Sequence, residues 1–381
     1  MRHDSLIEPD VEGPRERFRR FAEMVLAPHA AQSDQTGLLE PRVIDAMCGE
    51  GLLGAPVSVE HGGSGMSMID YGLLTAEVAR VCAASRTLLT VHNLVALTLQ
   101  RWGRSSLKTG LLADLATGRA LAAIALSEPD AGSDIQSIST TITPELGGYR
   151  LNGRKSWVSF GMIADWFLVF GLSPSGGVAL MVAASTPGLS RRPELEMTGA
   201  RAGMMAHLDF DNCFIADEHM VARPGFGLSH VASTAVDHGR YSVDWGGVGV
   251  AEACLDLTMR HLRARRQFGQ AMADLPLAKA AVSQMFVDAR AARHLCHAAG
   301  ELRDQHSADA LVETMAAKYF AAGAAARAAN TAVRLHGARG LLASHPVQRL
   351  LRDAKVLEII EGGPELHELL IAAQLGPKGV P

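Results

Sequence analysis

The chain has 381 residues, carries a formal net charge of −4 and is 48% hydrophobic, which is typical of a globular protein with two or three domains. Lys and Arg (36) nearly balance Asp and Glu (40), so the sequence lacks the charge pattern of nucleic-acid-binding proteins and favours small molecules or proteins as partners. The five cysteines are scattered without a CxxC pair, and no apolar signal core or bilayer-length span is found. We therefore expect a soluble, cytoplasmic protein that contacts no membrane.

Three regions with different hydrophobic periods follow one another. From Arg15 to Gly118 the apolar spacing is helical, with helices expected in 20–31, 41–54, 68–82 and 89–103 and a glycine-rich loop at 60–67. Short β-type runs separated by Gly, Pro, Asp and Asn then predict a compact β domain. From Gly227 onward long helical patterns return, over 238–268, 276–306 and 308–337, which fits a bundle. We predict an α+β protein with domains at 1–119, 120–226 and 227–381.

Two motifs suggest chemistry that their context does not support. The segment GGVGVAEA, Gly246 to Ala253, is close to a dinucleotide fingerprint, but no strand precedes it, and its small residues fit close helix packing better. His294 and His297 are three apart on an expected helix, yet no carboxylate or thiol with ligand spacing accompanies them. We therefore predict neither a Rossmann site nor a metal site.

The β region contains two stretches that could hold a cofactor. LSEPDAGSD, Leu126 to Asp134, follows a strand with a turn whose backbone N–H groups and Ser133 hydroxyl can form a nest for a pyrophosphate or a flavin edge. In LNGRKSWVSFG we expect a hairpin turn at Asn152-Gly153, with Trp157 and Ser159 on one face of the next strand. The alternatives are a decorated β-turn and a core tryptophan beside a surface serine.

Near the C-terminus, VLEIIEGGPELHELL places Glu361 at the end of one helix and directly before Gly362-Gly363-Pro364. An anion at a helix C-terminus is unfavourable by roughly 0.3–1 kcal/mol. One interpretation is a solvated surface residue at a glycine-terminated helix. The other is a general base whose pKa is raised by the helix end and by the neighbouring isoleucines.

Together these segments resemble the signatures of the acyl-CoA dehydrogenase family, with RARRQFG, Arg263 to Gly269, and LLRDAKVLEIIEGGPEL as further matches. The resemblance covers essentially the whole chain. It implies an N-terminal α-helical domain, a middle β-barrel and a C-terminal four-helix bundle, with FAD between barrel and bundle. It also favours the general-base interpretation of Glu361.

Carried over position by position, the resemblance implies three sets of site residues. Glu361 is the catalytic base, because Gly239 stands where some members of the family keep that residue instead. Substrate contacts are implied for Ser133, Arg240 and Ile360. The implied FAD contacts are Leu126, Ser127, Gly132, Ser133, Trp157, Val158, Ser159, Arg265, Phe268, Gly337, Ala338 and Gly363. Since the adenosine end is bound in the family by a neighbouring subunit, a homodimer or homotetramer is implied.

The implied reaction is the FAD-dependent α,β-dehydrogenation of a short acyl thioester, with an acceptor such as an electron-transfer flavoprotein. IIEG, RVCAASRTLLT, HGRYSVDWGGVGV and ADWFLVFG look most like the branch that oxidises acyl groups on acyl carrier proteins in polyketide (antibiotic) extender-unit pathways of the methoxymalonyl type. A short-chain acyl-CoA dehydrogenase and a carrier-bound aminoacyl dehydrogenase are alternatives within the family. A flavin monooxygenase or oxidase, or a non-catalytic scaffold, are alternatives on the same fold.

The chain also departs from the family pattern. It has Ile360-Glu361-Gly362-Gly363 where Tyr-Glu-Gly-Thr is frequent, and Leu275-Pro276 where a His-Gln pair usually follows the FGxxL segment. These departures affect the adenosine contacts more than the base.

Overall fold

The computed structural model describes residues 12–374; residues 1–11 and 375–381, the outer ends of the first and last expected domains, lie outside this range. The chain begins with a nearly continuous helical rod made of α1 (Glu12–Phe21), η1 (Ala22–Leu26) and α2 (Ala27–Thr36). Then come α3 (Pro41–Gly49), η2 (Val59–His61), α4 (Met68–Val81), α5 (Ala83–Trp102), α6 (Ser105–Thr109) and α7 (Leu111–Ala116). All four helices expected in this region are present, as is the loop at 60–67.

Helix α5 occupies the centre of the molecule. Sixteen of its residues, from Ala84 to Leu99, are buried, and the helix contacts both α8 of the C-terminal region and strand β1 of the sheet. Most of these residues are apolar, so their burial is favourable at roughly 25 cal/mol per Å² of apolar surface. The other seven buried residues, among them Arg86, are polar and need hydrogen-bond partners.

The middle region is a curled sheet whose strands run in the order β1-β4-β2-β3-β7-β6, with β5 paired to β4. The strands are β1 (Ala122–Ala125), β2 (Thr141–Glu145), β3 (Gly148–Val158), β4 (Trp166–Ser173), β5 (Gly176–Ala183), β6 (Leu189–Pro193) and β7 (Ala206–Ala216). Two short 3-10 turns, η3 (Ile135–Ser137) and η4 (Arg201–Gly203), lie between strands, and a third, η5 (Asp217–His219), follows β7. This curled sheet stands where the sequence predicted a β-barrel domain.

The prediction of a hairpin turn at Asn152-Gly153 is wrong. Both residues lie inside β3, where the pairing with β7 shifts register between Leu151 and Gly153. Gly153 has φ 145°, and a Cβ there would lie 2.6 Å from the Thr140 hydroxyl oxygen, so glycine is needed for a bulge. The actual β2–β3 turn contains Gly147, with φ 79°.

The C-terminal region is built from η6 (Gly227–Ala232), α8 (Ser233–Ala264), α9 (Pro276–Asp304), α10 (Ala310–His336), α11 (Pro346–Ile359) and α12 (Pro364–Gln374). A small hairpin, β8 (Arg266–Gln267) and β9 (Gln270–Ala271), and η7 (Met272–Asp274) join α8 to α9, while η8 (Gly337–Leu341) joins α10 to α11. The predicted reason for the small residues of GGVGVAEA is confirmed: a Cβ at Gly249 would lie 2.1 Å from the carbonyl oxygen of Ala76 on α4.

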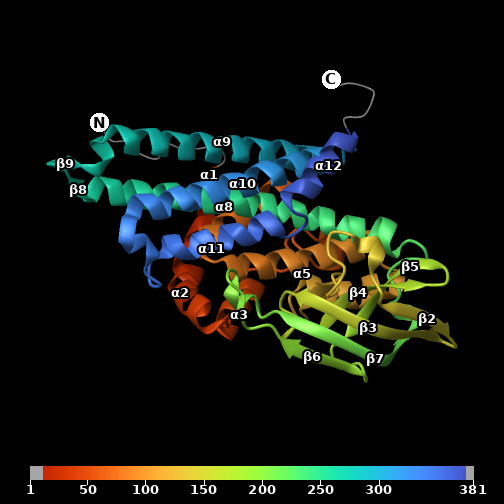
Figure 1. Ribbon diagram of the computed structural model, residues 1–381. Helices are drawn as coiled ribbons and strands as arrows, with labels where there is room; N and C mark the ends of the chain where they lie inside the picture. Colours follow the sequence, from red (N-terminus) through yellow and green to blue (C-terminus); the bar gives the residue numbers. More distant parts are fainter. Residues whose placement is uncertain (1–11, 375–381) are drawn as a thin grey trace.

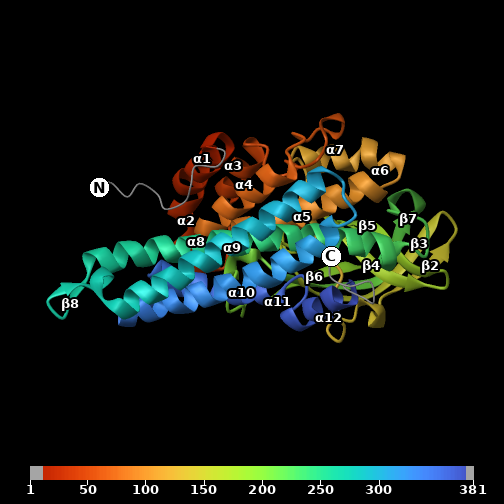
Figure 2. The same cartoon turned by 90° about the horizontal axis from the view of Figure 1, so that it is seen from above.

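Figure 1 shows the sheet at one end of an elongated molecule and the β8–β9 hairpin at the other, with the long helices spanning the distance between them. Seen from above in Figure 2, the N-terminal helices lie along one side of the bundle, where α4 and α5 contact α8. Within residues 12–374, no helix combines the length and apolar character that crossing a bilayer requires.

Candidate active site

Glu361 lies in a strained turn immediately after α11. Ile360 leaves the helix with φ −68° and ψ 155°, and Glu361 then adopts φ 57°, a left-handed conformation. For a residue other than glycine this costs about 1–2 kcal/mol. Such a conformation persists only when the surrounding structure fixes it, and this one turns the side chain toward α8.

The carboxylate of Glu361 occupies the space above Gly239 on α8. A Cβ at Gly239 would lie 2.5 Å from Cδ of Glu361 and 2.6 and 2.8 Å from its two carboxylate oxygens. Burial raises the pKa of Glu361 to about 7, even though Arg240, Lys318 and Arg86 act in the opposite direction. The carboxyl group of this half-buried residue therefore packs against the helix, and near neutral pH it can both accept and release a proton.

Two cations hold the backbone of this turn. Arg240 Nε donates to the carbonyl oxygen of Glu361 at 3.1 Å. Lys318, on α10 and 1% exposed, donates from Nζ to the carbonyl oxygens of Glu358 (3.1 Å) and Gly362 (2.5 Å). These carbonyls lie at the negative end of α11, where a cation is the favourable partner.

Lys318 and Arg86 are site residues that sequence reasoning missed. Each is a single charge in an otherwise apolar or alanine-rich helical run, VCAASRTLLT for Arg86 and MAAKYFAAG for Lys318. Both are 1% exposed, which is rare for unpaired charges. A single charge on the apolar side of an expected helix was the sequence signal that could have identified these two residues.

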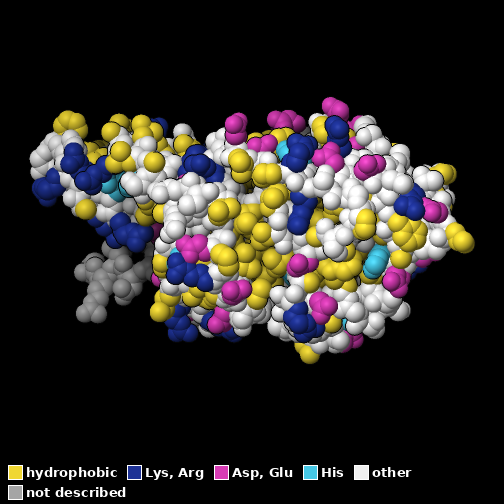
Figure 3. Space-filling model, turned by 90° about the horizontal axis from the view of Figure 1, so that it is seen from below, with side chains coloured by type: hydrophobic (Ala, Val, Ile, Leu, Met, Phe, Trp, Pro, Cys, Tyr) yellow, Lys and Arg dark blue, Asp and Glu magenta, His cyan; other side chains and the backbone are white. Residues whose placement is uncertain are grey.

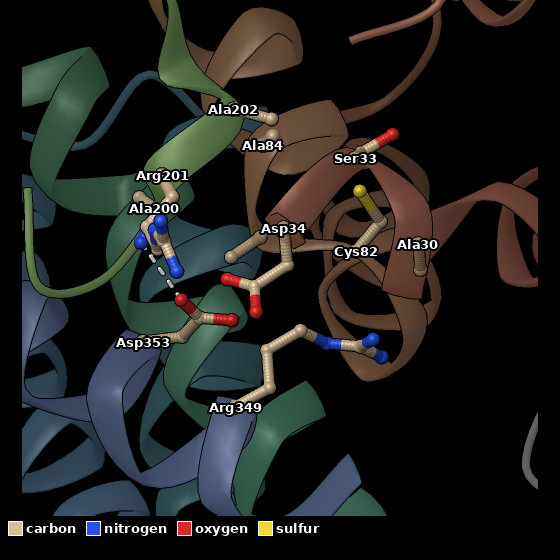
Figure 4. Close-up of a pocket in the computed structure, with 11 residues that line it drawn as sticks. Ala30, Ser33, Asp34, Cys82, Ala84, Ala200, Arg201, Ala202, Arg349 and Asp353 are labelled. Carbon is tan, nitrogen blue, oxygen red and sulfur yellow. Dashed lines mark hydrogen bonds between the residues drawn. The ribbon is translucent and has the colours of Figure 1, made fainter. Parts of the chain in front are cut away.

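The helix that carries Glu361 is fixed to both other regions of the chain. Asp353 accepts from the backbone N–H of Ala200 at 2.8 Å, and Arg352 binds the two carboxylate oxygens of Asp34 at 3.0 and 2.6 Å. Figure 4 shows Asp34, Arg349 and Asp353 around the small pocket where α2, the 200–202 turn and α11 meet. Burial raises the pKa of Asp353 to about 6. These contacts position α11, and with it Glu361.

The LSEPDAGSD turn is fixed from within by a buried carboxylate. Glu128 accepts from Lys155 Nζ at 2.7 Å, from the backbone N–H groups of Ser139 and Thr140 at 2.6 and 3.0 Å, and from both of their hydroxyls. Although burial alone would raise the pKa of Glu128, these donors lower it to about 2. The turn is thus a rigid element with its backbone edge directed outward.

Strand β3 lies beside this turn, because the Ser156 N–H donates to the Ser127 carbonyl oxygen at 2.9 Å and Lys155 Nζ to that of Leu126 at 2.9 Å. Trp157, with φ 61°, interrupts the strand alternation and is 52% exposed, and its ring lies edge-on to His207, with centroids 5.1 Å apart. Val158 is buried and Ser159 half-buried. The strict strand alternation predicted for Trp157 and Ser159 is therefore wrong, since Trp157 leaves the strand conformation and β3 ends at Val158.

The structure brings the expected site residues together in three groups. One contains Arg240, Ile360, Glu361 and Gly363 at the α8–α11 contact, and the second contains the 126–133 turn with the end of β3. The third, exposed at the bundle end far from the sheet (Figure 1), comprises Arg265, Phe268, Gly337 and Ala338. Within one chain the third group lies apart from the other two.

Models of three acyl-CoA dehydrogenase domains match the chain in order: the N-terminal domain over 9–119, the middle domain over 123–213 and the C-terminal domain over 227–376. An acyl-CoA dehydrogenase of Bacillus subtilis is 34% identical over 367 residues, covering 95% of this chain and 96% of that protein. The chain belongs to the acyl-CoA dehydrogenase family. It is an oxidoreductase, and the cofactor of the family is FAD.

Two solved structures are similar to this chain over nearly their whole length. FkbI, for biosynthesis of the methoxymalonyl extender unit of a polyketide immunosuppressant, has a TM-score of 0.87 and 31% identity, over 95% of this chain and 98% of FkbI. The prolyl acyl carrier protein oxidase AnaB has a TM-score of 0.91 and 25% identity, over 95% and 98%. The expected order of helices, β domain and helices is that of acyl-CoA dehydrogenases, and the β domain has the form of a curled sheet.

The residues of this acyl-CoA dehydrogenase fit FAD. A Cβ at Gly132 would meet nothing within 4 Å, so the backbone edge of the turn is open to a phosphate. Among the described residues, the hydroxyls of Ser127 and Ser133 have no hydrogen-bond partner. A pocket of ≈ 290 Å³, lined by Ser156, Trp157 and His207 among others, reaches the turn at Pro129. The backbone N–H groups and serine hydroxyls of the turn are suitable donors to a phosphate, and the exposed indole of Trp157 can stack on a planar ring.

Proposed function

We propose that this acyl-CoA dehydrogenase removes the α proton and the β hydride of a short acyl thioester carried on an acyl carrier protein. The observation that carries the proposal is the carboxylate of the half-buried Glu361, packed over Gly239 beside three cations, with a pKa of about 7. A poised carboxylate in a site shielded from water is what abstraction of a weakly acidic α proton requires.

In this mechanism Glu361 accepts the α proton on a carboxylate oxygen. The N–H of Glu361 faces the thioester carbonyl and stabilises the charge that develops there. Arg240 holds the carbonyl of Glu361, and Lys318 holds those of Glu358 before it and Gly362 after it, so the two cations keep the direction of this N–H fixed. When bound by Leu126, Ser127, Gly132, Ser133 and the Trp157–Ser159 segment, FAD supplies the acceptor for the β hydride. Ser133 and Ile360 are proposed to line the acyl thioester, and Gly363 the flavin.

The carrier-bound substrate is supported by the two similar structures whose names refer to a methoxymalonyl extender unit and to an acyl carrier protein. We place the enzyme in polyketide or antibiotic biosynthesis, with an electron-transfer flavoprotein as acceptor. A short-chain acyl-CoA substrate is the second candidate, favoured by the Bacillus subtilis relative.

A comparison of one acyl group on CoA and on its cognate carrier protein tests this assignment. We expect a kcat/KM at least ~10-fold higher for the carrier form, falling as salt is added, because a carrier presents an acidic surface that arginines can attract. Stopped-flow flavin reduction at two salt concentrations provides the measurement. Equal kcat/KM values with no salt effect would assign the enzyme to CoA thioesters.

The third residue group supports a homodimer or homotetramer. At the bundle end two large apolar side chains are exposed, Phe268 (87%) and Leu341 (72%), and a subunit contact would remove them from water. In Figure 3 apolar side chains also gather over the middle of the underside of the molecule. We propose that Arg265, Phe268, Gly337 and Ala338 hold the adenosine end of FAD bound to a neighbouring subunit.

We expect Arg265→Ala to weaken FAD retention at least ~10-fold, since an arginine on a pyrophosphate makes charge-assisted hydrogen bonds. Flavin content after gel filtration, with the oligomeric state from light scattering, measures this loss. Arg263→Ala, another exposed arginine two residues away, is the control and should keep its flavin. If the Arg265 variant retains flavin as the parent does, the assignment of this group is wrong.

A further inference from the structure

His367 is a fully buried histidine near the start of α12, on the segment that follows the proposed base. It is 0% exposed, and its Nδ1 lies 3.0 Å from the carbonyl oxygen of Gly363, which also accepts from the backbone N–H of His367 at 3.2 Å. Because a carbonyl oxygen can only accept, the ring carries its proton on Nδ1 and is the donor in this contact. The imidazole therefore joins α12 to the residue two positions beyond Glu361.

The ring also packs against the backbone that leads from Glu361 to α12. Gly362 has φ 100°, and a Cβ at this position would lie 3.1 Å from Cε1 and 3.5 Å from Nδ1 of His367. A side chain at 362 would press on the ring that binds the Gly363 carbonyl, and it would also strain the backbone. Gly362 and His367 thus form one packed junction between the base and α12.

Three successive carbonyl groups after α11 accept hydrogen bonds from side chains of three different helices. Arg240 on α8 donates to the carbonyl of Glu361, Lys318 on α10 to that of Gly362, and His367 on α12 to that of Gly363. Helix α12 packs against α10, where the Tyr319 hydroxyl donates to Glu368 at 2.9 Å. The first two of the three donors are cations, and His367 is the exception.

The imidazole of His367 is neutral over the pH range in which the base titrates. Burial lowers the pKa of His367 to about 4, and the cations Lys318 and Arg240 act in the same direction. The pKa of Glu361, by contrast, is raised by burial to about 7. Among the described residues, Nε2 of His367 is buried without a hydrogen-bond partner, so a second proton would create an unpaired N–H at further cost.

We propose that His367 is a positioning residue that fixes the segment after Glu361 through a neutral N–H, adding no positive charge beside the base. The inference rests on the proposed function, because it takes Glu361 as the base. A fourth cation beside the three that already act on this carboxylate would favour its ionised form and make it a weaker base. A neutral donor holds the backbone without that effect.

Substitutions at His367 separate the donor from the charge. His367→Leu fills similar space without a donor, and His367→Asn restores a neutral amide N–H close to the position of Nδ1. With the acyl thioester that reduces the parent fastest, we expect the rate per bound flavin to fall ~10-fold or more in His367→Leu and to stay within ~3-fold of the parent in His367→Asn. Flavin content should be parental in both. The matched control is His294→Leu, which replaces an exposed histidine on α9 and should leave the rate unchanged.

A positive charge at the same position tests the importance of neutrality. In His367→Lys the pH profile of flavin reduction should shift to lower pH, because a cation lowers the pKa of a neighbouring carboxyl group. The profile of His367→Asn should match that of the parent. A loosened fold alone would lower stability and flavin content but would change neither the rate per flavin nor the profile. If His367→Lys does not fold, the Leu and Asn variants decide.

Hydrogen–deuterium exchange in the peptide that spans residues 358–367 measures positioning without requiring turnover. We expect exchange to be at least ~10-fold faster in His367→Leu and unchanged in His367→Asn. Parental exchange together with a parental rate per flavin in the Leu variant would overturn the role of His367. An unshifted pH profile in a folded Lys variant would overturn the importance of its neutrality.

The proposed function fails separately. If exchange responds as expected but no acyl thioester reduces the flavin of the parent, the positioning by His367 stands and the reaction does not. If a thioester reduces the parent and the Leu variant equally fast per flavin, the reaction stands and the role of His367 does not.

Discussion

Replacing Glu361 by Gln is expected to slow flavin reduction by an acyl thioester at least ~10²-fold, the scale of losing a general base. The amide has nearly the same shape and still fits above Gly239, so FAD and substrate should bind as in the parent. It cannot accept the α proton. Stopped-flow flavin reduction under single-turnover conditions is the measurement, with Glu358→Gln on the same helix as the control.

The pH dependence provides a second check on the same residue. Flavin reduction in the parent should rise with pH through about 7, the pKa to which burial raises Glu361, because only the ionised form is a base. A raised carboxyl pKa means that the folded state binds the proton more tightly than the unfolded state does. The stability contributed by this group is therefore full below the unfolded pKa of about 4.3 and is lost as pH rises toward 7.

The Gln variant accordingly should not be less stable than the parent at pH 8. A flavin-loaded Gln variant that still exchanges the substrate α proton and reduces flavin at the parental rate would assign the base to another group.

Lys318→Met is expected to have the next largest effect. It removes the donor to the carbonyls of Glu358 and Gly362, and each buried carbonyl left without a partner costs about 1–3 kcal/mol. We expect the free energy of unfolding to fall by roughly 2–4 kcal/mol. Flavin reduction should fall ~10-fold or more, since the Glu361 turn has lost one of its two fixed points.

The loss of this charge should also raise the apparent pKa of flavin reduction, because Lys318 acts to lower the pKa of Glu361. Chemical denaturation and the pH profile measure the two effects. Lys355→Met, on α11 with its side chain 67% exposed, is the matched control and should change neither. A Lys318 variant with parental stability and an unshifted profile would show that the turn is held by other contacts.

The helices of this fold were predictable because their apolar positions repeat with a helical period over long segments, as in α4, α5 and α8. The curled sheet was recognisable from its turns, but one of those turns was placed wrongly. Asn-Gly is a strong hairpin signal, and here Gly153 serves a bulge inside β3, which only the pairing with β7 and the contact with Thr140 determine. Local turn chemistry does not distinguish the two outcomes.

The candidate site was also predictable only in part, because tertiary contacts between distant segments determine it. The unusual position of Glu361 at a helix end raised the hypothesis of a base, and only the family resemblance favoured it and drew attention to Gly239. The cations around it come from α5, α8 and α10 and lie up to 275 positions away in the chain, as for Arg86. No sequence pattern joins them. The left-handed backbone of Glu361 and Trp157 likewise depends on tertiary contacts, since neither residue favours it.

The contact between Glu361 and Gly239 shows that two different segments of the chain can supply a side chain to the same point in space. The volume filled by the carboxylate is the volume into which any side chain at position 239 would project. Only one of these two positions can carry a large side chain at a time. An acid could therefore pass from the turn after α11 to α8 over the course of evolution with little movement in space, provided that the first position became small. Glycine at 361 would accept φ 57° without strain, so the exchange would remove a steric cost from the backbone.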